Sequence, residues 1–209
     1  MRVIILLQCS MAREIDSHAV AAAGHREMSE RMIIVLNGYP GVGKLAIGRE
    51  LAALIKGRLL DIHSVYNVAF ALTEFKSPEF KEAVERIEAI AHDLIRKLPN
   101  GVPIVLTTVL AGESDWGKSE WERIEALGIA RPPFCVVHVG CSLEENIRRI
   151  QSTERDVKRK PRDSDMAVRN QSQAKPLAGL DAVNLLRLDT TGLSVEESAR
   201  AIADWAAAK

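Results

Sequence analysis

The sequence has no excess of charge of either sign. Its 209 residues include 28 lysines and arginines and 28 aspartates and glutamates, so the formal net charge is zero. Non-specific nucleic-acid binding calls for a strongly basic domain, which this chain is not. Aromatic residues make up only 4% of the chain, which leaves few side chains for stacking on single-stranded bases. We therefore do not expect a nucleic-acid partner.

Long apolar runs and cysteines are also scarce. No stretch approaches the roughly 20 apolar residues that a membrane helix needs, so we expect no membrane partner. The three cysteines, Cys9, Cys135 and Cys141, are too few and too unevenly spaced for a disulfide framework or a zinc site. This predicts a reducing, cytoplasmic location. Apolar residues make up 47% of the chain, enough for one sizeable core.

The first 31 residues lack the regular pattern of the rest. The apolar stretch Val3–Leu7 resembles the core of a short signal peptide, but a polar, charged segment follows it instead of a cleavage site. We interpret residues 1–31 as a loosely held N-terminal extension, with Met28 or Met32 as alternative translation starts. Residues 32–209 then form one domain.

Beyond the extension, short apolar runs alternate with longer segments whose apolar residues recur at helical spacing. This alternation is typical of a parallel sheet with right-handed crossovers. The predicted strands are Met32–Asn37, Arg58–Asp61, Val102–Thr108, Phe134–Val139 and Val183–Leu188. The predicted helices cover 44–56 and 78–97 or begin at the capping serines Ser119, Ser142 and Ser194. We predict a three-layer α/β fold with a parallel five-stranded sheet flanked by helices.

A glycine-rich loop separates the first predicted strand from the first predicted helix. Gly38, Gly43 and Lys44 match the pattern G-x-x-x-x-G-K. Glycines let backbone N–H groups approach phosphate oxygens, the following helix N-terminus favours anions, and the lysine reaches the β- and γ-phosphates. An ordinary turn is the alternative, but the context favours an ATP site. The predicted nucleotide-binding residues are Gly38, Pro40, Gly41, Val42, Gly43, Lys44 and Leu45.

The positions that would ligate Mg²⁺ depart from the full pattern. A Ser or Thr should follow the lysine, but Leu45 and Ala46 stand there, and neither side chain can bind the ion. Thr107 and Thr108 end the third strand. Many proteins with this loop pattern carry an aspartate there, but this strand contains none. We therefore expect no direct protein ligand, and a water-held Mg²⁺ near Asp61. The alternative is a site that holds nucleotide without fast chemistry.

The segment Gly38–Glu50, with Asp61 ending the second strand and a basic stretch after the fourth, resembles the small P-loop kinases of the shikimate kinase and nucleoside monophosphate kinase type. It is most similar to a bacterial group with the pattern G-x-P-G-V-G-K-L, often classified as AAA-family ATPases. The resemblance spans roughly residues 32–205. It implies a P-loop NTPase fold, ATP as phosphoryl donor and a mobile lid at about residues 149–172.

The resemblance also implies roles for residues that follow the strands. Asp61 would contact the acceptor hydroxyl or help to place Mg²⁺, unless it is only a helix cap or a surface carboxylate. Asp189 begins a turn that would lie beside the adenine, unless the turn merely joins a strand to a helix. His63 can face the same cleft as Asp61, and Thr107 and Thr108 can bind a phosphate or a water. The alternatives for these three are packing for the histidine and simple strand preference for the threonines.

A basic stretch runs from Arg148 to Arg162 and holds seven lysines and arginines. Such a run is often only a solvated helix face, and an RNA-binding patch is a further alternative. We favour the lid, because lid arginines fold over the triphosphate and neutralise charge that develops in the transition state. Arg149 and Arg155 are the best candidates.

These observations together predict an ATP-dependent kinase. It would move the γ-phosphoryl of ATP to a small-molecule acceptor, with catalytic roles for Lys44, Asp61, Arg149 and Arg155. The missing Mg²⁺ ligands favour a first alternative, an ATPase or a nucleotide-binding regulatory protein without an acceptor. The basic stretch favours a second, a polynucleotide-end or nucleoside kinase. No pattern sets the oligomeric state.

Overall fold

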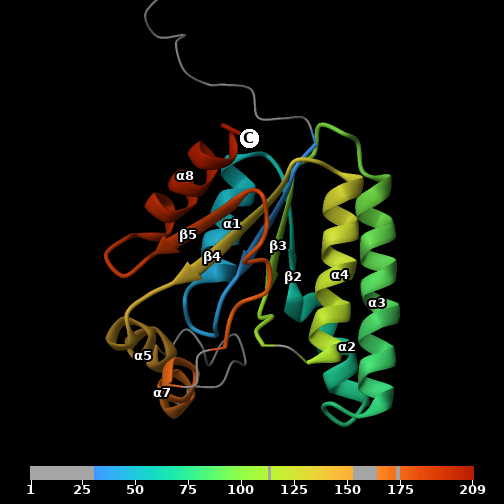
Figure 1. Ribbon diagram of the computed structural model, residues 1–209, viewed down its shortest axis with the longest axis horizontal. Helices are drawn as coiled ribbons and strands as arrows, with labels where there is room; N and C mark the ends of the chain where they lie inside the picture. Colours follow the sequence, from blue (N-terminus) through green and yellow to red (C-terminus); the bar gives the residue numbers. More distant parts are fainter. Residues whose placement is uncertain (1–30, 113, 153–163, 173–174) are drawn as a thin grey trace, which may run out of the picture.

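A single parallel sheet organises the described part of the chain. The computed structural model describes residues 31–112, 114–152, 164–172 and 175–209. The strands are β1 (Ile33–Asn37), β2 (Arg58–Asp61), β3 (Ile104–Thr108), β4 (Phe134–Gly140) and β5 (Leu185–Asp189). They lie in the order β2-β3-β1-β4-β5, and every neighbouring pair is parallel (Figure 1). The predicted five-stranded parallel sheet is confirmed. The predicted N-terminal extension lies outside the described residues, apart from Arg31.

Helices cover both faces of this sheet. They are α1 (Lys44–Leu54), α2 (Ile62–Leu72), α3 (Pro78–Lys97), α4 (Asp115–Ala130), α5 (Leu143–Gln151), α7 (Ser164–Ser172) and α8 (Val195–Ala206). The pair α1 and α8 packs on one face, and α3 and α4 pack on the other (Figure 1). The short helices α5 and α7 lie beyond the carboxyl end of β4 (Figure 1). The predicted three layers are therefore confirmed.

The central strand β1 explains the two-sided architecture, because all five of its residues are buried. Ile34 packs in an apolar cluster that includes Ile47 of α1 and Ile202 of α8. The next residue, Val35, points to the opposite face and packs in a second cluster with Leu127 of α4. A strand buried on both faces has a continuous apolar sequence, which is why the run was recognisable.

Serine side chains begin several of the helices, as predicted. The hydroxyl oxygens of Ser77, Ser142 and Ser194 each accept a hydrogen bond from a backbone N–H in the first turn of α3, α5 and α8. The capping box is complete only at Ser194, where the Glu197 side chain also accepts from the serine N–H. Each cap satisfies an N–H group that has no partner inside the helix.

The predicted start of the fourth helix at Ser119 is wrong. α4 begins at Asp115, and Ser114 is its cap, with its hydroxyl accepting from Gly117 N–H at 3.2 Å. Ser119 lies inside the helix, where its hydroxyl accepts from Arg123 at 2.8 Å. The additional turn carries Trp116, which packs in an aromatic cluster with α2 and α3. The sequence pattern also did not indicate the helices α2 and α7.

Candidate active site

The loop between β1 and α1 has a backbone that depends on glycine. Gly41 and Gly43 have φ angles of 93° and 99°, in the left-handed region that side chains disfavour. A Cβ at Gly41 would lie 2.7 Å from the Cγ1 atom of Ile150 and 2.9 Å from the Nδ2 atom of Asn146, both on α5. Gly41 is thus required by its own conformation and by the close approach of α5.

Asn37 fixes the end of β1 at which this loop begins. Its side-chain amide donates to the carbonyl oxygens of Leu110 (2.9 Å) and Ala178 (3.2 Å), and its Oδ1 atom accepts from Leu110 N–H (3.0 Å). Asn37 is fully buried. Sequence reasoning did not single it out, although an asparagine that ends an otherwise apolar strand is a usable signal for a buried hydrogen-bonding role.

Lys44 is the first residue of α1 and is 8% exposed. Its Nζ atom donates to the carbonyl oxygens of Gly38 (2.5 Å) and Tyr39 (2.9 Å), at the start of the same loop. The ammonium group is therefore held against the loop backbone. Leu45 and Ala46 follow in the first turn of α1, as the sequence requires, without a hydroxyl group.

Arg149 connects three segments around the loop. Its guanidinium donates to the carbonyl oxygen of Val42 at 3.0 Å, to the Thr190 hydroxyl at 2.9 Å and to the Thr190 carbonyl at 2.7 Å. Its Nε atom also donates to Glu145 at 2.6 Å. Hydrogen bonds from Arg148, followed by those from Arg149, lower the pKa of Glu145 to about 2. Arg149 thus lies beside the phosphate loop and joins α5 to the turn after β5.

The other predicted lid arginine, Arg155, lies outside the described residues. Asp189 ends β5, and its Oδ1 atom accepts hydrogen bonds from Thr191 N–H and from the Thr191 hydroxyl. The same bonds, led by the hydroxyl, lower the pKa of Asp189. The carboxylate therefore shapes the turn that carries Thr190, the residue that Arg149 contacts.

Asp61 and Thr107 meet at the carboxyl ends of β2 and β3, where they are register partners. The Thr107 hydroxyl donates to the Asp61 carboxylate and accepts from Ile62 N–H at 3.4 Å. Thr107 is buried, so this hydrogen bond holds one carboxylate oxygen in place. His63 is the second residue of α2, two positions after Asp61 in the sequence, and it is half-buried. Thr108 is buried, and its hydroxyl has no hydrogen-bond partner among the described residues.

The oxygen groups at this edge fit Mg²⁺ only in part. Asp61 and the two threonine hydroxyls are the hard donors that the ion prefers. In the part of the chain that the structure describes, no three His, Cys, Asp or Glu side chains gather into a metal site. The donor set therefore fits an ion whose other ligands are nucleotide phosphates and water.

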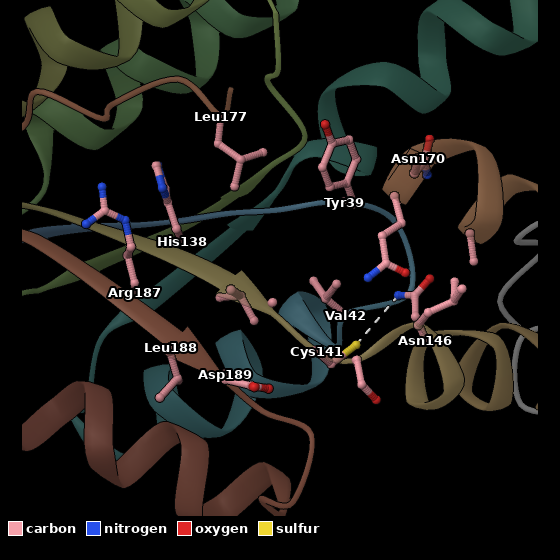
Figure 2. Close-up of a pocket in the computed structure, with 16 residues that line it drawn as sticks. Tyr39, Val42, His138, Cys141, Asn146, Asn170, Leu177, Arg187, Leu188 and Asp189 are labelled. Atoms are coloured by element: carbon pink, nitrogen blue, oxygen red, sulfur yellow. Dashed lines mark hydrogen bonds between the residues drawn. The ribbon is translucent and has the colours of Figure 1, made fainter. Parts of the chain in front are cut away.

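A cavity of about 580 Å³ lies beside the phosphate loop, between the carboxyl ends of β4 and β5 and the helices α5 and α7 (Figure 2). Of the predicted site residues that the structure describes, only Val42 and Asp189 line it. Lys44, Asp61 and Thr107 do not. The carboxyl edge of the sheet thus has two adjoining regions, the loop with the Asp61 edge and this cavity, which Val42 of the loop also lines.

Tyr39 ties the phosphate loop to the segment that follows α7. Its hydroxyl donates to the Lys175 carbonyl at 2.9 Å and accepts from Lys175 N–H at 2.7 Å. Sequence reasoning missed this contact, because Tyr39 occupies a variable position of the loop pattern and Lys175 is 136 residues away. Its ring also lines the cavity (Figure 2).

Comparison with known proteins agrees with this fold. The family model of an AAA domain matches residues 34–171. No protein of curated function matches the sequence. Many solved structures share the fold. A provisionally assigned kinase from Chloroflexus aurantiacus is 20% identical, with a TM-score of 0.59 over 85% of this chain and 94% of that one.

Two named kinases are similar at the level of the fold. A gluconokinase from Sinorhizobium meliloti is 13% identical, with a TM-score of 0.57 over 87% of this chain and 94% of that chain. A shikimate kinase from Bacteroides thetaiotaomicron is 17% identical, with a TM-score of 0.52 over 82% and 95%. None of the helices in the described ranges is long and apolar enough to cross a membrane. The chain belongs to the AAA domain family and has the fold of the small P-loop kinases.

Proposed function

We propose that this protein is an ATP-dependent phosphotransferase with a small-molecule acceptor. One observation carries the proposal: two left-handed glycines and the buried Lys44 form a phosphate loop at the carboxyl end of the central strand. Open α/β sheets bind ligands at this edge, where the strand order reverses. The backbone N–H groups of the loop and the N-terminus of α1 would hold the phosphates.

Lys44 would neutralise the β- and γ-phosphates. Its ammonium group is now bonded to the Gly38 and Tyr39 carbonyls, so nucleotide phosphates would compete for the same donor. A charged phosphate oxygen is a stronger acceptor than a carbonyl oxygen, which favours the exchange. Arg149 would act from the other side of the loop, with the turn that carries Thr190 beside the adenine.

Asp61 would orient the acceptor. The Thr107 hydroxyl occupies one carboxylate oxygen, which leaves the other for the acceptor hydroxyl. In the reaction the acceptor oxygen bonds to the γ-phosphorus, the bond from this phosphorus to the bridging oxygen breaks, and ADP leaves. The proton of the acceptor hydroxyl passes to Asp61. Mg²⁺, when bound, would neutralise charge on the phosphates, and Asp61 would hold it through water.

An ATPase or regulatory function without an acceptor is the second candidate. Two missing groups favour it: β3 carries no carboxylate, and no hydroxyl group follows Lys44. In related sites these two groups speed phosphoryl transfer. Such a site would still bind nucleotide through the loop.

The experiment is ADP release from Mg-ATP by the full chain, with and without a panel of acceptors. The panel contains gluconate, shikimate, simple sugars and nucleosides, because the named neighbours include a gluconokinase and a shikimate kinase. Lys44→Ala is the test variant, and Lys97→Ala, an exposed lysine on α3, is its control. The proposal expects ADP release that rises with one acceptor class and disappears only in Lys44→Ala. Turnover that is equal with every compound supports the ATPase instead.

A further inference from the structure

The helix α3 carries a second apolar stripe, apart from the face that packs on the rest of the protein. The buried face includes Phe80, Val84 and Ile95. The second stripe recurs at spacings of four, three and four residues and consists of Ala83, Ile87, Ile90 and Leu94. The side chains of Ile90 and Leu94 are 63% and 61% exposed. The sequence pattern merges the two stripes into one helix, and burial in the structure separates them.

The stripe has a hollow where its smallest residue lies. A cavity of about 330 Å³ lies beside Ala83 and is walled by Glu79, Glu82, Arg86 and Ile87 of the same helix. It opens outward, because α3 lies at the outer edge of the molecule (Figure 1) and three of these residues are exposed. An alternating spacing of four and three is that of a coiled-coil seam, in which a side chain of one helix enters a hole between four residues of the other. The hollow at Ala83 has the form of such a hole.

A second copy of α3 supplies the side chain that fits this hollow. In an antiparallel pair in which Ile87 faces Ile90 of the second copy, Leu94 falls opposite Ala83, because both pairs are symmetric about the point between residues 88 and 89. The exposed leucine then enters the hollow at the alanine, and two-fold symmetry repeats each contact. The stripe is therefore complementary to itself.

The same register brings opposite charges together beside the seam. Arg86 and Asp93 lie seven residues apart and flank the stripe on one side. In an antiparallel coiled coil these flanking positions face each other, so Arg86 lies beside Asp93 of the second copy. Within its own helix, Arg86 is paired with Glu82 at 2.6 Å and Asp93 with Arg96 at 3.3 Å, so pairing of the helices creates a row of alternating charges. A parallel pair would not bring Arg86 and Asp93 together, so the charges select the antiparallel copy.

We propose that α3 is the interface of a homodimer, in which two copies of this helix pack antiparallel through the stripe from Ala83 to Leu94. At 1.5 Å per residue this seam is about 18 Å long. It is therefore smaller than a standard interface, and we expect a weak dimer with a Kd of about 10–100 μM. Neither the phosphate loop nor Asp61 contributes to the seam, so the dimer does not depend on the proposed function.

The test is sedimentation equilibrium of the full chain between about 1 and 500 μM, a range that brackets the expected Kd. Ile90→Lys places a charge at the centre of the seam and should raise the dimer Kd at least about tenfold. Leu94→Ala leaves the hollow at Ala83 unfilled and should raise it at least about threefold. Val183→Lys is the control, because Val183 is fully exposed in the turn before β5, on the other side of the molecule (Figure 1). It should leave the Kd unchanged.

Charge reversal tests the register itself. Arg86→Glu and Asp93→Arg each place like charges together twice across the seam, so each should raise the Kd about three- to tenfold. The double variant restores opposite charges and should return the Kd to within about twofold of the wild type. A structural effect confined to one helix would not be rescued in this way.

Four outcomes overturn the proposal. These are a monomer at every concentration, a dimer that Ile90→Lys leaves intact, an equal effect of Val183→Lys, and a double charge reversal that fails to restore the dimer. A thermal melt shows whether each variant is folded, and Leu94→Ala supplies the second reading if Ile90→Lys is unstable. Lys44→Ala should dimerise like the wild type, so failure of the phosphotransferase proposal would leave this result intact.

Discussion

The two sides of the proposed reaction site are built from different parts of the chain. On the nucleotide side, backbone groups would bind the phosphates, and their positions follow from the left-handed Gly41 and Gly43 and from the packing of α5. On the acceptor side, side chains would bind the acceptor, and Asp61 depends on Thr107, which lies 46 residues away on another strand. A local sequence pattern can describe the first arrangement and cannot describe the second. The comparison therefore separates what a local pattern can predict from what depends on contacts between distant segments.

The largest effect should come from removing the acceptor-side carboxylate. Asp61→Asn keeps the hydrogen bond from Thr107 but cannot take the acceptor proton, so kcat should fall by about 10²–10³. Because Asp61 does not line the loop, the Kd for ATP should change by less than about twofold. ADP-release kinetics and an ATP titration measure the two quantities.

The matched control is Asp204→Asn, an exposed aspartate on α8, which should leave both quantities unchanged. A proportional loss of ATP affinity in Asp61→Asn would contradict the division between the two sides.

A change on the nucleotide side should instead weaken ATP binding. Gly41→Ala places a Cβ within 2.7 Å of Ile150 and forces a methyl group onto a φ of 93°, so the loop must shift. We expect the Kd for ATP to rise about 10- to 100-fold, measured by calorimetry. Gly101→Ala, where an added Cβ meets nothing within 4 Å, is the control. Equal affinities for the two variants would show that the loop conformation does not bind the nucleotide.

The same division explains what the sequence allowed us to predict. The sheet, its order of elements and the phosphate loop were predictable, because buried parallel strands and glycine-rich turns leave continuous local patterns. The serine caps of α3, α5 and α8 were predictable for the same reason.

The remaining features depend on contacts between distant residues. The start of α4 depends on the packing of Trp116 against α2 and α3, and α2 itself has no strong pattern of its own. The bond between Tyr39 and Lys175 and the ties of Arg149 to Val42 and Thr190 join segments far apart in the chain. No rule of sequence spacing predicts such contacts, so only the three-dimensional structure reveals them.

Arg148 and Arg149 are adjacent on α5 but have different contacts, so a comparison of their variants tests the contribution of Arg149 to the nucleotide side. Arg149→Ala removes the bonds to Val42 and Thr190, so we expect a loss of about 1–2 kcal/mol in unfolding free energy and a weaker ATP affinity. Arg148 is largely exposed and, among the residues that the structure describes, contacts only Glu145, so Arg148→Ala should cost clearly less stability than Arg149→Ala. Chemical denaturation compares them. Equal losses would mean that the contacts of Arg149 with the loop carry no stability.

The smallest effect concerns α3 and α4, which pack on the face of the sheet opposite to α1 and α8. These two helices bury ionisable side chains, whereas the cluster between the sheet, α1 and α8 is apolar. Glu120 is fully buried and accepts a hydrogen bond from the Tyr66 hydroxyl at 2.7 Å. Burial raises the pKa of Glu120 from 4.5 to about 7. The folded protein therefore keeps a proton that the unfolded chain loses, and this contribution to stability is lost as the pH rises through about 7.

Glu120→Gln keeps the acceptor for Tyr66 and removes the titration. Between about pH 6.5 and pH 8.5, its unfolding free energy should gain about 1 kcal/mol relative to the wild type. His92, whose pKa burial lowers to about 4, acts in the opposite direction at lower pH and is common to both proteins. Denaturation at several pH values measures the difference. A difference that does not vary with pH would contradict a raised pKa at Glu120.

The central claim is that the loop around Lys44 binds ATP, and calorimetric titration of Mg-ATP into the wild type and Lys44→Ala tests it most directly. Lys97→Ala is the control, and a thermal melt confirms that each variant is folded. The account predicts saturable binding by the wild type and by Lys97→Ala, and affinity at least about 100-fold weaker in folded Lys44→Ala. Equal ATP affinity in the wild type and in Lys44→Ala, or no binding by the wild type, would contradict it.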